Sequence, residues 1–240
     1  MNPRDTAAAT AETLVQRLEQ RVHSVLLYGS AARDEFLQKR SDINILVLLD
    51  RIDTSLLRAL APLADEWMRR QINPMLIEER EWTRASDSFA VELLDMQDAH
   101  ALLYGPDPLD GIRIDPADAR LQAERELRGR LIALHNGMVR SARRPAELGD
   151  LLMTALPSFV TYLRTALRLT GGAVPRPMLQ VIEQGTRLVD APDTGFVRAL
   201  EARRRNGAWP VDLNDDVVEQ YGAAAERTAW FVDSLEGNRQ

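Results

Sequence analysis

Four residues have types and spacing suited to a phosphorylated ligand. Gly29 and Ser30 end one apolar run, and Asp42 and Asn44 open the next one after eleven intervening residues. Glycine lets a ligand approach the backbone, and a serine where a helix begins suits phosphate. Asp42 and Asn44 are two positions apart, so a strand places both side chains on one face. Two oxygen-bearing side chains that face a phosphate cradle suit a hard cation such as Mg²⁺.

The elements that must position these residues are expected to form a small sheet with helices packed on it. The run 42–50 is the strongest strand candidate, and its nearly continuous apolar character indicates that both of its faces are covered. Further strands are expected at 23–29, at 73–78 and within 102–115. Helices are expected at 5–22, 54–71 and 89–100, with a short helix or turn at 31–36. Pro62 is expected to kink or shorten the helix at 54–71.

From Pro116 onward the sequence carries apolar stripes at helical spacing. One long helix is expected to be interrupted at Pro157 and to end at Gly171 and Gly172. Further helices are expected at 177–189, at 194–205 and from 214 onward. We therefore predict an α+β protein with two domains. Residues 1–116 would form an α/β domain with a small mixed sheet and flanking helices, and residues 117–240 an all-α antiparallel helical bundle.

The segment 27–44 resembles the nucleotidyltransferase superfamily of the DNA polymerase β type. The family pattern is a hydrophobic strand, Gly-Ser, roughly ten residues, and then Asp-x-Asp or Asp-x-Glu on a second strand. The stretches 89–105 and 157–169 also look like prokaryotic nucleotidyltransferase-domain proteins with a C-terminal helical bundle. The resemblance implies that Gly29 and Ser30 hold the β- and γ-phosphates of a nucleoside triphosphate. It also implies that Asp42 is the first ligand of Mg²⁺.

The chain departs from the family pattern at two acidic positions. Asn44 stands in place of the second acid, and the strand expected to carry a third acid, 73–77, contains none. Glu78 and Glu79 come only at the end of that strand, and we interpret them as surface residues. An amide gives Mg²⁺ an oxygen but no charge, and each charge–charge interaction lost at about 4 Å and an effective dielectric near 20 is on the order of 4 kcal/mol. The sequence therefore supports the fold more firmly than the reaction.

Most of the other charged residues that we considered are interpreted as surface residues. Arg33 and Lys39 are expected in solvent, whereas Arg40, close to Asp42, is the best candidate for a further phosphate contact. An acidic stripe exposed to solvent is expected from Glu92, Asp95 and Asp98, which recur every three residues. The run 203–205, three arginines, is expected to be an exposed helix end.

Composition excludes several classes of protein. The 240 residues are 45% hydrophobic and 28% charged, as in an ordinary globular protein, with a net charge of −6. No run of about 18 apolar residues is present, so neither a transmembrane helix nor a membrane partner is expected. The absence of cysteine excludes disulfides, thiolate catalysis and cysteine-based zinc sites, and fits a cytoplasmic protein. The first 116 residues hold 13 basic and 20 acidic side chains and the rest 17 and 16, so a nucleic-acid partner is not expected.

Two functions follow from the resemblance. The first is an enzyme that transfers a nucleoside monophosphate from Mg²⁺–NTP to a hydroxyl of a small-molecule or protein acceptor. Its catalytic and metal-binding residues would be Asp42 and Asn44, and Gly29, Ser30 and Arg40 would bind the nucleotide. The second is a catalytically degenerate nucleotidyltransferase fold that binds a nucleotide or a partner and regulates it. The apolar faces of the bundle could then serve a homodimer.

A third hypothesis concerns the helical half. Arg130 and His135 have the Arg-x₄-His spacing seen in HEPN ribonucleases, whose bundles often accompany nucleotidyltransferases. Residues five apart do not share one face of a straight helix, which weighs against this hypothesis.

Overall fold

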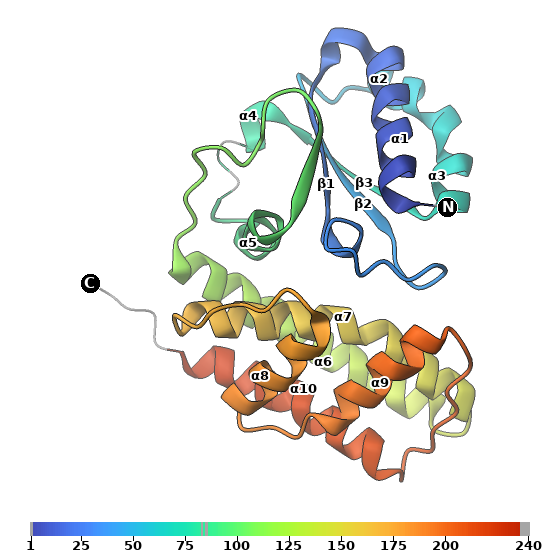
Figure 1. Ribbon diagram of the computed structural model, residues 1–240, viewed down its shortest axis with the longest axis vertical. Coiled ribbons are helices and arrows are strands. Elements are labelled where there is room, and N and C mark those ends of the chain that lie inside the picture. Colours follow the sequence, from blue (N-terminus) through green and yellow to red (C-terminus); the bar gives the residue numbers. More distant parts are fainter. Residues whose placement is uncertain (1, 83, 85, 236–240) are drawn as a thin grey trace. The chain divides into compact units, whose positions relative to one another are not determined.

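The computed structural model describes residues 2–82, 84 and 86–235, and the chain forms two compact units, Met1–Ile114 and Asp115–Gln240. Unit 1 contains a four-stranded mixed sheet, and unit 2 is helical (Figure 1). This arrangement confirms the predicted α+β fold class. Over the described residues, no helix combines the length and the apolar character needed to cross a membrane.

The strand order in unit 1 is β3-β2-β1-β4. The strands are β1 (Val22–Tyr28), β2 (Ile43–Leu49), β3 (Ile72–Glu78) and β4 (His100–Tyr104). β1 runs antiparallel to β2 and β4, whereas β2 and β3 are parallel. One end of the sheet therefore gathers the last residue of β1 and the first residues of the other three strands.

Both faces of the sheet are covered, as the apolar run of β2 predicted. Helices α1 (Pro3–Leu18), α2 (Thr54–Leu60) and α3 (Ala64–Arg70) lie on one face, where Leu14 and Leu56 pack against Leu27 and Ile45. Helices α4 (Glu79–Trp82) and α5 (Ala90–Asp98) lie on the other, as Figure 1 shows. Residues from successive positions of β2 alternate between these two cores, which fixes the face of every polar residue on the strand.

The helix expected over 54–71 is divided at Pro62. A short 3₁₀ turn, Ala61–Leu63, separates α2 from α3, because a proline removes a helical hydrogen-bond donor. α3 then ends at Gln71 in the left-handed conformation (φ 55°), and the chain enters β3 directly. The turn thus keeps both short helices on the sheet.

Unit 2 consists of α6 (Pro116–Ser141), α7 (Pro145–Leu169), α8 (Met178–Leu188), α9 (Thr194–Arg205) and α10 (Asp216–Ser234). The rings of Phe159, Phe196 and Tyr221 meet at its centre, with centroids 4.7–6.3 Å apart. Burial raises the pKa of the Tyr221 hydroxyl, which donates to the Leu152 carbonyl.

The interruption predicted at Pro157 is wrong, because α7 runs through it without a break. A proline there has no N–H for the carbonyl of Met153, four residues earlier. The guanidinium of Arg203 on α9 donates to that carbonyl at 3.0 Å. Arg203 is only 6% exposed, so the exposed helix end expected over 203–205 holds for Arg204 and Arg205 but is wrong for Arg203. A buried arginine thus satisfies the carbonyl that the proline leaves free.

Candidate functional site

The Gly-Ser pair forms a tight turn at the end of β1. Gly29 has φ +75°, and a Cβ built on it would lie 2.9 Å from Nδ2 of Asn44. The φ favours glycine, because an L side chain is strained there, and a Cβ would also displace the Asn44 amide. The 3₁₀ turn Gly29–Ala31 follows, with Ser30 half-buried. The segment is a single turn, so the predicted phosphate cradle would depend on its backbone and on Ser30 rather than on a helix dipole.

Asp42 and Asn44 lie at the entry of β2, beside this turn. Asp42 immediately precedes the strand and is exposed, and Asn44 is half-buried. In the antiparallel ladder Asn44 is opposite Tyr28, the residue before Gly29. The structure therefore brings the two halves of the predicted motif together at one end of the sheet.

Asn73 is a site residue that the sequence reasoning missed. It is level with Asn44 in the parallel ladder of β2 and β3, and its Nδ2 donates to Oδ1 of Asn44 at 3.1 Å. Sequence analysis had noted only that this strand lacks an acid. Asn73 could have been identified from the sequence by assuming that β2 and β3 are parallel and that the first polar residue of each strand is paired with the other. We call this end of the sheet, with Gly29, Ser30, Asp42, Asn44 and Asn73, the amide end.

Glu78 and Glu79 do not supply the missing acid. Glu78 is level with Leu49 at the opposite end of β3, five residues and about 16 Å from Asn73. Its carboxylate accepts from the backbone N–H of Ile52 at 2.8 Å and from Arg80 at 2.6 Å. Oε1 of Glu79 lies 3.1 Å from Nε2 of His23. Glu78 is buried, so its expected place on the surface is wrong.

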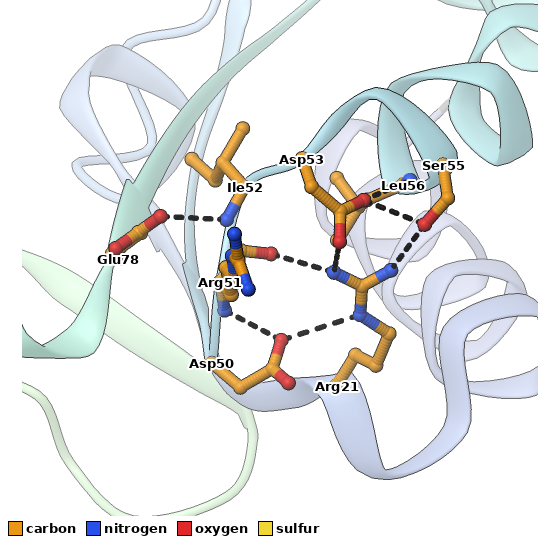
Figure 2. A network of polar contacts seen from close by, with 8 residues as sticks. All are labelled: Arg21, Asp50, Arg51, Ile52, Asp53, Ser55, Leu56 and Glu78. Carbon is orange, nitrogen blue, oxygen red and sulfur yellow. Dashed lines mark hydrogen bonds and ion pairs between the residues drawn. The ribbon is translucent and has the colours of Figure 1, made fainter.

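The opposite end of the sheet holds a connected set of charges, shown in Figure 2. Arg21, just before β1, pairs with Asp50 at 3.3 Å and with Asp53 at 3.2 Å. Asp53 caps α2 by accepting from the Leu56 N–H at 2.8 Å. We call this end, with Arg21, Asp50, Asp53 and Glu78, the carboxylate end.

Hydrogen bonds hold two of these carboxylates in the charged form. The hydroxyl of Ser55 and the backbone N–H of Leu56 lower the pKa of Asp53. The Ile52 N–H and Arg80 lower the pKa of Glu78. Glu78 thus joins β3 to the segment that leads into α2, and Asp53 joins Arg21, just before β1, to the start of α2.

The charged residues near the amide end differ from expectation. Arg33 is not in solvent, because its side chain is 6% exposed and pairs with Asp95 of α5. Asp95 and Glu92 also act on Tyr28, whose pKa is raised to about 12 by burial first and then by these two carboxylates. The stripe on α5 therefore faces the protein in part, and Tyr28 stays protonated at neutral pH.

Arg40 and Lys39 lie in the loop that leads to Asp42. Lys39 is exposed and has φ 68°, and the backbone N–H of Arg40 donates to Leu37. A phosphate contact from Arg40 stays a prediction. The nucleotide-binding roles of Gly29 and Ser30 and the catalytic and metal-binding roles of Asp42 and Asn44 also stay predictions.

The donor set at the amide end is one carboxylate and two amides. Within residues 2–82, 84 and 86–235, no three His, Cys, Asp or Glu side chains gather where they could hold a metal ion. Oδ1 of Asn44 already accepts from Asn73. These residues do not fit a pair of Mg²⁺ ions, which carboxylates normally hold.

Arg130 and His135 do not converge in unit 2. Both lie on α6, and five residues turn their side chains about 140° apart around the helix axis. His135 forms an ion pair with Glu226 of α10 at 3.3 Å. The geometry gives the ribonuclease hypothesis no support.

Comparison with known proteins finds a structural likeness without a sequence match. No protein-family model matches the chain, and no curated protein sequence matches it. The crystal structure of spectinomycin adenyltransferase AAD(9) from Enterococcus faecialis, solved with ATP and spectinomycin, superposes with a TM-score of 0.62. The match covers 93% of this chain and 98% of that one, at 13% identity. The chain therefore has the fold of a nucleotidyltransferase, as the Gly-Ser and Asp-x-Asn motif predicted.

Proposed function

We propose that this protein binds a nucleoside triphosphate at the amide end of the sheet, as a nucleotidyltransferase fold that has lost most of its transfer machinery. The observation that carries the proposal is the meeting of Gly29 with Asn44. A left-handed glycine without a Cβ lets the turn approach Asn44 closely, and Ser30 and Asp42 border the same turn.

The loss of transfer chemistry follows from the donor set. Nucleotidyl transfer relies on cations to neutralise the triphosphate and to activate the incoming hydroxyl. Asn44 stands in place of the second acid that the family resemblance implies, and the stretch 73–77 expected to carry the third has no acid and begins with Asn73, which is hydrogen-bonded to Asn44. The amides contribute no charge, so a cation pair would lose two charge–charge interactions of about 4 kcal/mol each at an effective dielectric near 20.

A thermal-shift titration tests the proposal. We expect at least one of ATP, GTP, CTP and UTP to stabilise the protein, by about 2.7 kcal/mol at 100 times its dissociation constant. Ser30→Asp adds a negative charge to the cradle and should abolish the shift. Ser88→Asp, at an exposed position in the same unit, is the matched control and should preserve it. If no nucleotide stabilises the wild type, the proposal fails.

The transferase remains the second candidate, and the exposed Asp42 beside the cradle favours it. In this case the substrate would be Mg²⁺–NTP, and the acceptor a hydroxyl of a small molecule or a protein. The bound spectinomycin of the structural neighbour makes a small hydroxylated molecule the first acceptor to try.

Two variants separate the candidates. The double variant Asn44→Asp/Asn73→Asp restores carboxylates at both positions and should create or raise Mg²⁺-dependent pyrophosphate release with an acceptor panel. Activity in the wild type that is lost in Asp42→Ala, with unchanged melting temperature, would establish the transferase instead. The expected cytoplasmic location suits both candidates, because nucleoside triphosphates are abundant there.

A further inference from the structure

The amide of Asn44 lies across the sheet between Asn73 and Gly29. β2 lies between β3 and β1. On the β3 side, Oδ1 of Asn44 accepts from Nδ2 of Asn73 at 3.1 Å. On the β1 side, Nδ2 of Asn44 faces Gly29, 2.9 Å from where a Cβ would stand. The oxygen therefore points away from the cradle and the N–H donors point toward it.

This direction reverses the chemistry expected at the position. A carboxylate beside a triphosphate repels it and needs a bridging cation. An amide N–H beside a triphosphate donates to it directly, and hydrogen bonds to charged oxygens are stronger than neutral ones. With the Asn73 amide in the orientation seen here, its Nδ2 favours this direction, because a rotation of the Asn44 amide by 180° would turn its nitrogen toward the Asn73 donor.

We infer that the cradle binds its nucleotide as the free polyphosphate anion, without a divalent cation, with Nδ2 of Asn44 as a phosphate donor. The inference rests on the proposed nucleotide site and specifies the form of the ligand. Asp42 is the one acid among the five residues of the amide end, and Asp95 near Tyr28 is paired with Arg33, so the repulsion that a cation must overcome is smaller than in a site with three carboxylates.

The first experiment titrates ATP, GTP, CTP and UTP by calorimetry in EDTA and in excess Mg²⁺, at matched ionic strength. We expect the dissociation constant of the preferred nucleotide in EDTA to be within about threefold of its value in Mg²⁺, or tighter. Binding that appears only with Mg²⁺ overturns the inference and keeps the proposed function. No binding in either condition overturns both.

Variants then test the Asn44 donor. Asn44→Asp replaces the donor with a carboxylate, and we expect binding in EDTA to weaken at least about tenfold and to recover with Mg²⁺. Gln20→Glu, at an exposed position just before β1 and so at the other end of the sheet, adds the same charge and should change nothing. If the Asn44→Asp variant binds the nucleotide in EDTA as tightly as the wild type, Nδ2 of Asn44 is not a phosphate donor and the assignment is wrong.

Two changes at Asn73 separate direction from charge. Asn73→Ala removes the group that holds the Asn44 amide and adds no charge, so a partial loss of EDTA binding is expected. Asn73→Asp offers an acceptor on the β3 side, draws Nδ2 of Asn44 toward it and should cause a larger loss. Melting temperatures without ligand show whether each variant is folded. If both folded variants bind in EDTA like the wild type, the role assigned to the amide pair is wrong.

Discussion

At the carboxylate end of the sheet, Asp50, Asp53 and Glu78 are all engaged by Arg21, Arg80 or backbone N–H groups. At the amide end, about 16 Å along β3, neutral Asn44 and Asn73 bond to each other beside a glycine turn. At the carboxylate end of unit 1, charged side chains therefore join strands to the neighbouring loops. At the other end, two neutral amides stand in place of carboxylates, and we propose that the Asn44 amide donates to an anion.

The largest expected effect is at the amide end, in Gly29→Ala. The new Cβ would meet Nδ2 of Asn44 and the residue would be held at φ +75°, so we expect nucleotide binding to fall more than about tenfold and stability by about 1–2 kcal/mol. Gly111→Ala is the matched control, because Gly111 has φ +73° and open space around it. It should lose similar stability and no binding. Equal binding losses in both variants would assign the effect to strain alone.

The next largest effect is at the carboxylate end, in Asp53→Ala. The change removes the cap of α2 and one partner of Arg21, so the melting temperature should fall by several degrees while nucleotide affinity stays unchanged. Asp53→Asn keeps a capping oxygen, so its melting temperature should fall less than that of Asp53→Ala. A parallel loss of nucleotide affinity would show that the two ends are coupled and would break the comparison.

A smaller effect is expected in the pH dependence of stability. The lowered pKa values of Asp53 and Glu78 mean that the folded state binds fewer protons than the unfolded state as the pH falls. Their contribution is complete above about pH 5 and is lost as the pH falls below about 4, through the folded-state values. Urea unfolding from pH 6 to pH 3 measures this decline. Asp53→Asn and Glu78→Gln should each make it shallower, and a slope unchanged in both would contradict the assignment.

The smallest effect is expected from Asp42→Asn. If the amide end binds a free anion, loss of its one carboxylate should leave nucleotide affinity in EDTA unchanged or slightly tighter. The measurement is the same calorimetric titration. A clear loss of binding would give Asp42 a ligand-binding role, and a loss confined to Mg²⁺ would favour the transferase candidate.

Local patterns predicted much of unit 1. The apolar run of β2, the Gly29–Ser30 turn and the alternation of Asp42 with Asn44 are short-range features, so their strand, turn and shared face could be read from the chain. The helix at 54–71 was predicted with a defect at Pro62, since a proline acts on its own turn. By contrast, the burial of Arg33 and Glu78 depends on α5 and on the segment after β2, which no local pattern specifies.

Unit 2 shows the same division. Apolar spacing predicted its helices, but the continuity of α7 through Pro157 depends on Arg203, forty-six positions later in the chain. A local rule assigns that proline to a helix break. The tertiary fold supplies a donor for the Met153 carbonyl, so the break is unnecessary.

The sequence by itself determined the α+β fold class, the glycine turn and the absence of acids at two expected positions, because these are set by residue type and near-neighbour spacing. Only the tertiary structure decided that Asn73 lies beside Asn44 and that the Asn44 nitrogen faces Gly29. These facts depend on the register of β3 against β2 and on the strand order, which pack residues far apart in the chain into one row. The direction of a single amide, and with it the proposed form of the ligand, follows from that row.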